Sequence, residues 1–167
     1  LPLLQALPMT SGVLDLACGS GRNGLLLARQ QIPVTFADIN ADALAAVKAQ
    51  LNTEGLSGVC WQVDLERAGT DVLGGKIFDA IIVFNYLHRE LLPALKLAIK
   101  PGGLIFYETF TIAQRKFGRP SHPDFLLQPE ELSLCFNDWE LLHNCEDQLR
   151  EPDRAVAQII ARKPLQG

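Results

Sequence analysis

The sequence has few cysteines, and they form none of the patterns that bind metals or build a disulfide scaffold. It contains no Cys-x-x-Cys pair, and no cysteine lies at zinc-binding spacing from a histidine. The four cysteines are Cys18, Cys60, Cys135 and Cys145. We therefore expect no metal site, and we expect a reduced, cytoplasmic setting.

Long hydrophobic runs and an excess of positive charge are also lacking. Apolar runs such as residues 80–84 are far too short to span a bilayer, and no signal peptide is recognisable. The 15 Lys and Arg residues are outnumbered by 19 Asp and Glu, which gives a formal net charge of −4. We therefore expect no membrane association. A nucleic-acid partner is disfavoured, because proteins that bind nucleic acids more often present a basic face.

What is present is the composition of an ordinary folded core. Of the 167 residues, 48% are hydrophobic and 20% are charged. This length suits one domain, and the composition is not that of a disordered chain. We therefore expect a single domain over residues 1–167.

Short apolar runs alternate with helical patterns along the first two thirds of the chain. The predicted strands are residues 12–17, 34–37, 58–63, 78–84, 104–110, 139–146 and 155–162. The predicted helices are residues 3–7 (a helix end), 22–30, 41–52 with Asn40 as N-cap, 90–99 and 129–136. The connections are a loop at 65–76 with room for a short helix, a turn at 101–103 and a long polar loop at 111–127.

This order predicts an α/β fold with a doubly wound, mostly parallel, seven-stranded, Rossmann-like sheet. The last two strands are joined by a loop that is too short for a crossover helix. They are therefore expected to form an antiparallel C-terminal hairpin at the sheet edge.

A glycine-rich segment, VLDLACGSGRNG at residues 13–24, follows the first predicted strand. Gly19, Gly21 and Gly24 form a G-x-G-x-x-G pattern, which lets the backbone approach a ligand at a helix N-terminus. Asp38 ends the second strand 19 positions after Gly19 (38 − 19). A carboxylate there can bind ribose hydroxyls, which occur in both NAD and S-adenosylmethionine.

Asp15 is the residue that discriminates between NAD and S-adenosylmethionine as the predicted ligand. It lies inside the first strand, four residues before Gly19. A pyrophosphate gains nothing from a nearby carboxylate, whereas a ligand with an ammonium and a sulfonium does. The short chain also leaves little room for the substrate half of a dehydrogenase. The residues therefore favour S-adenosylmethionine.

The whole pattern resembles the class I S-adenosylmethionine-dependent methyltransferases. The matching segments are VLDLACGSG at 13–21, ADI at 37–39, Asp64 after the third strand and KPGGL at 100–104. In size and layout the chain is most similar to the small methyltransferases of the tellurite-resistance type.

The resemblance implies a role for each residue of the cofactor site. Asp15 and the loop of Ala17, Cys18, Gly19 and Gly21 would hold the methionine moiety. Asp38 would bind the ribose, and Ile39 would pack on the adenine. Asp64 would contact the adenine amino group, and Leu65 and Phe84 would complete the pocket.

Several of these residues also have an ordinary structural interpretation. Asp38 is also a candidate helix cap, Asp64 a turn residue and Ile39 a core residue. Cys18 is better explained as a small filler, and Gly24 by helix packing.

The methyl acceptor is expected beyond the fourth strand, at residues 84–89. Asn85, Tyr86 and His88 are the candidate catalytic residues, with His88 as a base, an anion ligand or a helix cap. Some amino-group methyltransferases carry Asn-Pro-Pro-Tyr here. Both prolines are missing from this chain, which counts against methylation of a nucleobase or glutamine amide by that device.

Cations gather in the segments that should flank this acceptor site. Arg89 starts the next helix, and the loop at 111–127 carries Arg115, Lys116, Arg119 and His122, close to Glu108 and Tyr107 at the end of the fifth strand. We take Arg89, Glu108, Arg119 and His122 as candidate substrate ligands. They suggest a small oxyanion or carboxylate acceptor, unless the loop is simply a solvated basic segment. We also expect this loop to order over the cofactor.

Three other functions compete with methyl transfer to a small molecule. An NAD-dependent oxidoreductase would keep the glycine loop and Asp38 but would leave Asp15 unexplained. A methyltransferase-like domain without activity would bind the cofactor only. An RNA methyltransferase is disfavoured by the weak basic character.

Overall fold

One seven-stranded sheet organises the molecule in the computed structural model, which describes residues 1–166. The strands are β1 (Val13–Leu16), β2 (Val34–Asp38), β3 (Val59–Gln62), β4 (Phe78–Phe84), β5 (Ile99–Phe110), β6 (Glu140–Leu149) and β7 (Arg154–Arg162). Their spatial order is β3-β2-β1-β4-β5-β7-β6. Strands β1 to β5 pair in parallel, and β7 runs antiparallel to both β5 and β6. The predicted fold class, including the antiparallel hairpin at the edge, is confirmed.

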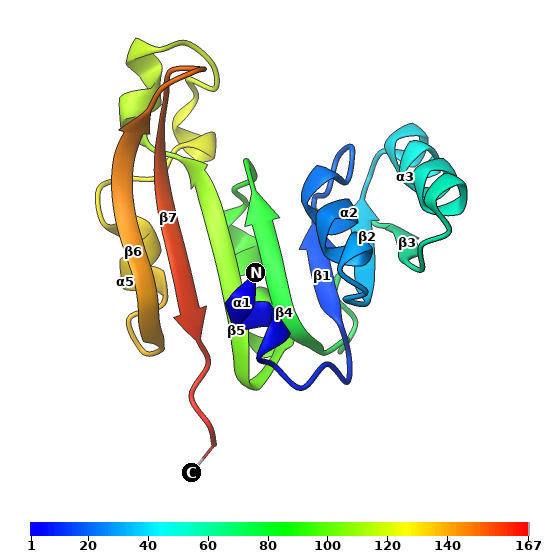
Figure 1. Cartoon of the computed structure of the whole chain (residues 1–167). Helices are drawn as coiled ribbons and strands as arrows, with labels where there is room; N and C mark the ends of the chain where they lie inside the picture. The colour runs from blue at the N-terminus through cyan, green and yellow to red at the C-terminus, as the bar shows by residue number, and fades with distance from the viewer. Residues whose placement is uncertain (167) are drawn as a thin grey trace.

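Helices cover both faces of the parallel part of the sheet (Figure 1). The α-helices are α1 (Pro2–Gln5), α2 (Arg22–Arg29), α3 (Ala41–Glu54), α4 (Leu92–Leu97) and α5 (Glu131–Cys135). The 3₁₀ helices are η1 (Arg89–Leu91), η2 (Ile112–Lys116) and η3 (Pro123–Phe125). A core cluster on one face includes residues of α2 and α3, and another on the opposite face includes residues of α4 and α5.

The start of α3 follows the sequence signal. The Asn40 side chain accepts hydrogen bonds from the backbone N–H groups of Asp42 and Ala43, at 3.0 and 3.1 Å. These bonds satisfy two of the amide groups that a helix leaves free in its first turn. Asn40, and not Asp38, is therefore the N-cap.

Two segments differ from the prediction. The helix predicted at 90–99 is η1 followed by the short α4, and β5 already begins at Ile99 and includes Pro101-Gly102-Gly103. Gly102 and Gly103 do not end this strand, because their backbone groups pair with Lys163 just beyond β7. The loop at 111–127 contains η2 and η3, while the part of the chain at 65–76 forms turns without a helix.

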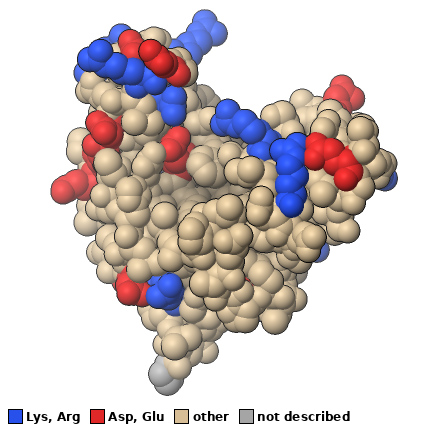
Figure 2. Space-filling view, viewed as in Figure 1, with Lys and Arg blue, Asp and Glu red and all other residues tan. Residues whose placement is uncertain are grey.

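The carboxyl ends of the parallel strands open on a hollow at the top of the molecule (Figure 2). Figure 1 shows α2 and α3 on one side of this hollow and the loop after β5 on the other. Lys and Arg side chains lie on both rims in this view, while the middle of the face is mostly uncharged. Ligands of open α/β sheets bind at this end, where the strand order reverses between β1 and β4.

Candidate functional site

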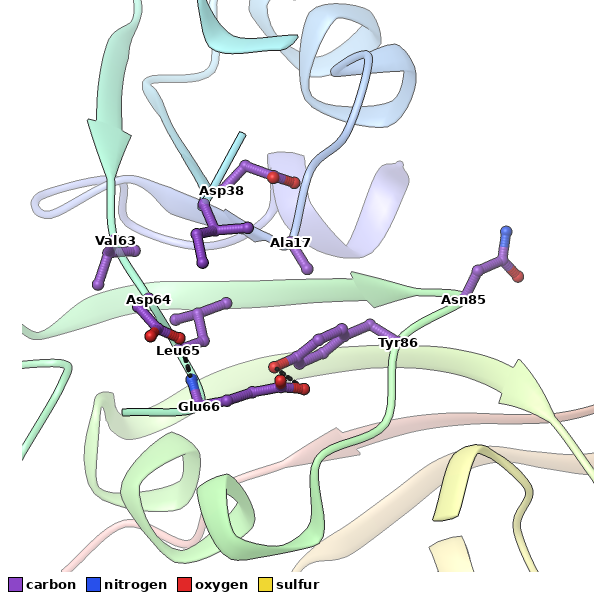
Figure 3. Close-up of a pocket in the computed structure, with 9 residues that line it drawn as sticks. Ala17, Asp38, Val63, Asp64, Leu65, Glu66, Asn85 and Tyr86 are labelled. Atoms are coloured by element: carbon purple, nitrogen blue, oxygen red, sulfur yellow. Dashed lines mark hydrogen bonds between the residues drawn. The ribbon is translucent and has the colours of Figure 1, made fainter. Parts of the chain in front are cut away.

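A cavity of about 320 Å³ lies at the carboxyl ends of β1 to β4 (Figure 3). Its charged lining residues are all acidic. The residues around it are Ala17, Asp38, Ile39, Val63, Asp64, Leu65, Glu66, Asn85 and Tyr86. Five of the predicted cofactor residues and two of the predicted catalytic residues are thus brought together.

Asp38 ties the glycine loop to the end of β2. Its Oδ2 atom accepts a hydrogen bond from the Gly19 N–H at 2.8 Å, and its Oδ1 atom accepts one from Asn40 N–H at 2.9 Å. A carboxylate has about four acceptor positions, so two remain. Asp38 can therefore hold the loop and still accept hydrogen bonds from a pair of hydroxyl groups.

The strands β1 and β4 end in residues with left-handed backbone conformation. Ala17 has φ of 52° and Asn85 has φ of 57°, and both line the cavity. This conformation is rare for non-glycine residues and costs free energy, least for asparagine. Strained backbone of this kind gathers at ligand sites.

One wall of the cavity is apolar and partly exposed. Ile39 has 61% of its surface accessible, while Leu65, which also lines the cavity, is buried. Next to Leu65, the Asp64 carboxylate accepts a hydrogen bond from Glu66 N–H at 3.0 Å. A cavity lined by an exposed isoleucine, a buried leucine and a carboxylate suits a flat ring that carries an amino group.

Tyr86 closes the opposite side of the cavity (Figure 3). Its hydroxyl donates a hydrogen bond to the Glu66 carboxylate at 3.4 Å, and its carbonyl accepts one from the Tyr107 hydroxyl at 2.8 Å. Burial, and then the negative charge of Glu66, raise the pKa of Tyr86 above its ordinary value. Tyr86 is therefore a neutral hydrogen-bond donor.

Asp15 lies behind the cavity wall. The side chain is buried, and its Oδ2 atom accepts a hydrogen bond from Gly24 N–H in the first turn of α2, at 3.0 Å. Burial, opposed by this hydrogen bond and supported by the charge of Asp38, raises the pKa of Asp15 to about 7. A Cβ at Gly24 would lie 2.6 Å from Asp15 Oδ2 and against Phe36, so Gly24 serves close packing.

The remaining predicted cofactor residues lie beside the cavity and do not line it. Gly21 is the N-cap residue of α2, and Phe84 packs against the core at the end of β4. Burial, and then the charges of Asp15 and Asp38, raise the pKa of the Cys18 thiol to about 12. A thiol in this state is not a nucleophile, which agrees with Cys18 as a filler.

The Arg89 guanidinium is engaged with the protein. It binds both oxygens of the Glu131 carboxylate, at 2.6 and 3.0 Å, and donates to the carbonyl groups of residues 123, 124 and 126. These bonds hold η3 and α5 against the start of η1. The contacts thus give Arg89 a structural position rather than one free for a substrate.

Other predicted acceptor residues are spread around the loop and β5. Glu108 accepts a hydrogen bond from the Gln158 side chain at 2.6 Å, and the Arg119 carbonyl accepts one from Gln114. The His122 ring accepts one from Asp124 N–H at 3.2 Å. His88 precedes η1 without capping it through its side chain. None of these four residues lines the cavity.

The prediction did not include Val63 and Glu66 among the cavity residues. Glu66 follows the predicted acid Asp64 by two positions and lies in the segment 65–76, which the sequence predicts to be a loop. The signal was the short acidic segment Asp64-Leu65-Glu66 itself.

Two kinds of feature are missing from the part of the chain that the structure describes. Among residues 1–166, no group of three His, Cys, Asp or Glu side chains is arranged to hold a metal ion. Within the same range, no helix has the length and apolar character needed to cross a membrane.

Comparison with known families gives one match over most of the chain. The family model described as "Tellurite resistance protein TehB" matches residues 6–160. The "Probable S-adenosyl-L-methionine-dependent methyltransferase TehB" of Haemophilus influenzae is 28% identical over 166 residues, covering 90% of this chain and 57% of that protein. The crystal structure of TehB from Haemophilus influenzae superposes with a TM-score of 0.74 and 27% identity, covering 90% of this chain and 57% of that one.

Two further relatives match differently. A Vibrio vulnificus protein named "Ribosomal RNA small subunit methyltransferase C" is 42% identical over 97 residues, which is 54% of this chain and 28% of that protein. A Methanosarcina mazei protein described as a SAM-dependent methyltransferase shares the fold, with a TM-score of 0.75, 18% identity and 99% of both chains covered. This chain thus spans less than two thirds of the length of the Haemophilus influenzae and Vibrio vulnificus relatives.

Proposed function

Since the chain belongs to the tellurite resistance protein TehB family, we propose that it is an S-adenosylmethionine-dependent methyltransferase that acts on a small-molecule acceptor. The observation that carries the proposal is the cavity in which Asp38 keeps two acceptor positions free beside an exposed Ile39.

The residues of the cavity fit the adenosine half of S-adenosylmethionine. Asp38 would accept hydrogen bonds from the ribose hydroxyls, Ile39 and Leu65 would contact the adenine, and Asp64 would accept from the adenine amino group. Ala17 and the glycine loop, backed by Asp15, hold the methionine half. The acidic lining suits a ligand that carries an ammonium and a sulfonium.

The chemistry asked of the protein is alignment. S-adenosylmethionine supplies a methyl group that its sulfonium already activates, so the chain must orient the acceptor, exclude water and accept a proton where the acceptor carries one. Asn85 and Tyr86, which follow β4 and line the cavity, would position the acceptor. His88, two residues further on, accepts its proton.

The finer hypothesis of an oxyanion or carboxylate acceptor rests on the basic residues of the loop. The Lys and Arg side chains on both rims of the hollow support it (Figure 2), as does the family description, because tellurite is an oxyanion. The engagement of Arg89 with Glu131 speaks against it, since that cation is already neutralised.

The acidic lining also disfavours the NAD-dependent alternative, because a pyrophosphate would lie among carboxylates. Calorimetric titration with S-adenosylhomocysteine and, separately, with NAD tests this choice. We expect micromolar binding of S-adenosylhomocysteine and none of NAD.

Asp38→Ala should abolish S-adenosylhomocysteine binding, because it removes both the ribose acceptor and the tie to Gly19. Asp42→Ala is the matched control, since Asp42 is exposed in the first turn of α3 and lies outside the cavity. Unchanged affinity in Asp38→Ala, or binding of NAD alone, would overturn the proposal. Binding without turnover of any acceptor would instead favour a methyltransferase-like domain without activity.

A further inference from the structure

Two residues that follow β4, Asn85 and Tyr86, are held by two neighbouring residues of β5. The Asn85 N–H donates a hydrogen bond to the Glu108 carbonyl at 2.9 Å. The Tyr86 carbonyl accepts one from the Tyr107 hydroxyl at 2.8 Å. The first bond joins two backbone groups and does not depend on the side chains. The second depends on a side chain, so it exists only because residue 107 is a tyrosine.

Packing alone does not require a hydroxyl group on the Tyr107 ring. The residue is 2% exposed and belongs to the apolar core cluster on the face of α4 and α5. A phenylalanine would fill this place, whereas a buried hydroxyl needs a hydrogen-bond partner. Within residues 1–166, no backbone N–H donates to the Tyr86 carbonyl, because the pairing of β4 with β5 ends at Phe84 and Glu108. The Tyr107 hydroxyl supplies the donor that the sheet does not.

The segment held by this bond is strained and lies at the cofactor cavity. Asn85 has a φ of 57°, and both Asn85 and Tyr86 line the cavity (Figure 3). A non-glycine residue keeps such a conformation only where its surroundings fix it. The Tyr86 ring also reaches the carboxylate of Glu66, another cavity residue, at 3.4 Å. Loss of the Tyr107 hydroxyl would therefore free the residues that close this side of the cavity.

We propose that Tyr107 is a positioning residue of the cofactor site, which acts through its hydrogen bond to the Tyr86 carbonyl and holds the Tyr86 ring at the cavity. The inference rests on the proposed function. A site that is already ordered loses less conformational entropy when its ligand binds. Without the hydroxyl, the segment must be ordered by the cofactor itself, so the affinity for the cofactor falls.

The variant Tyr107→Phe tests the affinity. By calorimetric titration, we expect its Kd for S-adenosylhomocysteine to be about 3- to 10-fold above that of the wild type, as for the loss of one hydrogen bond. Asp79→Asn is the matched control, because Asp79 is also buried and hydrogen-bonded but lies near the amino end of β4 and does not line the cavity. This control should lower the stability in urea and leave the Kd unchanged.

A spectroscopic measurement tests the hydrogen bond itself. The chain contains only two tyrosines, so labelling with tyrosine that carries ¹³C at the carbonyl carbon gives two NMR signals. In Tyr107→Phe only the Tyr86 signal remains, and in Tyr86→Phe only the Tyr107 signal remains, which assigns both. We expect the Tyr86 carbonyl signal to move upfield in Tyr107→Phe, because its carbon is no longer deshielded by the hydrogen bond.

A double-mutant cycle tests whether Tyr107 acts through the Tyr86 ring. Tyr86→Ala removes the ring and keeps the backbone carbonyl, so adding Tyr107→Phe to it should change the Kd less than about twofold. A full additional loss of affinity in the double variant would overturn the proposal. An unchanged Kd or an unmoved Tyr86 signal in Tyr107→Phe, or an equal rise of the Kd in Asp79→Asn, would overturn it as well. Failure of the wild type to bind S-adenosylhomocysteine would instead overturn the proposed function.

Discussion

Two buried aspartates illustrate how the surroundings of a carboxylate decide its charge. Asp15 accepts one backbone hydrogen bond, and its pKa is raised to about 7 by burial. Asp79 is also buried, but it accepts hydrogen bonds from the backbone N–H groups of Thr10, Ser11 and Gly12 and pairs with Lys100. Burial raises the pKa of Asp79, but these bonds outweigh it, and the pKa is lowered.

The two groups should affect stability with opposite dependence on pH. The folded state takes up a proton at Asp15 between pH 4 and 7, so this residue lowers the stability as the pH rises through that window. Asp15→Asn keeps an acceptor for Gly24 and carries no charge. At pH 8 we expect the free energy of unfolding of Asp15→Asn, measured by urea denaturation, to exceed that of the wild type by about 1–3 kcal/mol. At pH 4 we expect the two proteins to have the same free energy of unfolding.

Asp79→Asn is the matched variant with the opposite sign. A lowered pKa contributes stability that is present above the ordinary value and is lost as the pH falls through the folded value. Asp79→Asn should therefore lose about 2–3 kcal/mol at pH 7, and the loss should shrink in acid. Equal stability of Asp15→Asn and the wild type at pH 8 would show that ionisation of Asp15 does not lower the stability of the folded protein.

At the scale of elements, the loop after β5 is more ordered than its polar sequence suggests. It contains η2 and η3, and the buried Gln114 accepts a hydrogen bond from Ala155 N–H at the start of β7 and donates one to the Arg119 carbonyl. Arg89 and Glu131 fasten its far end. This pair connects η1, the loop and α5.

Removing this connection should loosen the loop. In Arg89→Gln, we expect trypsin to cleave at Arg115 and Lys116 about tenfold faster, because local opening becomes easier. Arg29→Gln, which breaks the exposed pair with Glu54 between α2 and α3, is the control and should leave these cleavages unchanged. S-adenosylhomocysteine should slow cleavage if the loop orders over the cofactor, and equal rates with and without it would count against a lid.

At the scale of the whole molecule, the sequence predicted what depends on local signals. The alternation of strands and helices, Asn40 as the cap of α3 and the antiparallel hairpin are all present, because periodicity and capping act within a few residues. The extent of β5 was not predictable, because Gly102 and Gly103 are held by Lys163, about 60 residues away.

The same distinction applies to the site. Asp38, Ile39 and Asp64 follow directly from the ends of strands, and they do line the cavity. The position of Arg89 could not be read from the sequence, because its partner Glu131 lies 42 residues away and only the fold brings them together. The sequence alone therefore does not show whether a charged side chain is already paired within the protein or is available to bind a ligand.

The charge of the whole molecule bears on the RNA alternative, which the match to a ribosomal RNA methyltransferase raises. The chain carries a net charge of −4, and the charged residues that line the cavity at the ends of β1 to β4 are acidic. Binding to RNA is driven by the release of counterions from phosphates that Lys and Arg neutralise, so an acidic protein gains little.

By fluorescence anisotropy with a labelled RNA hairpin, we expect no binding tighter than about 100 μM at 150 mM salt, and little increase in affinity at 25 mM salt. The basic rims of the hollow are the surface through which RNA would bind. Micromolar affinity that weakens steeply with salt would therefore contradict a small-molecule acceptor and favour RNA as the substrate.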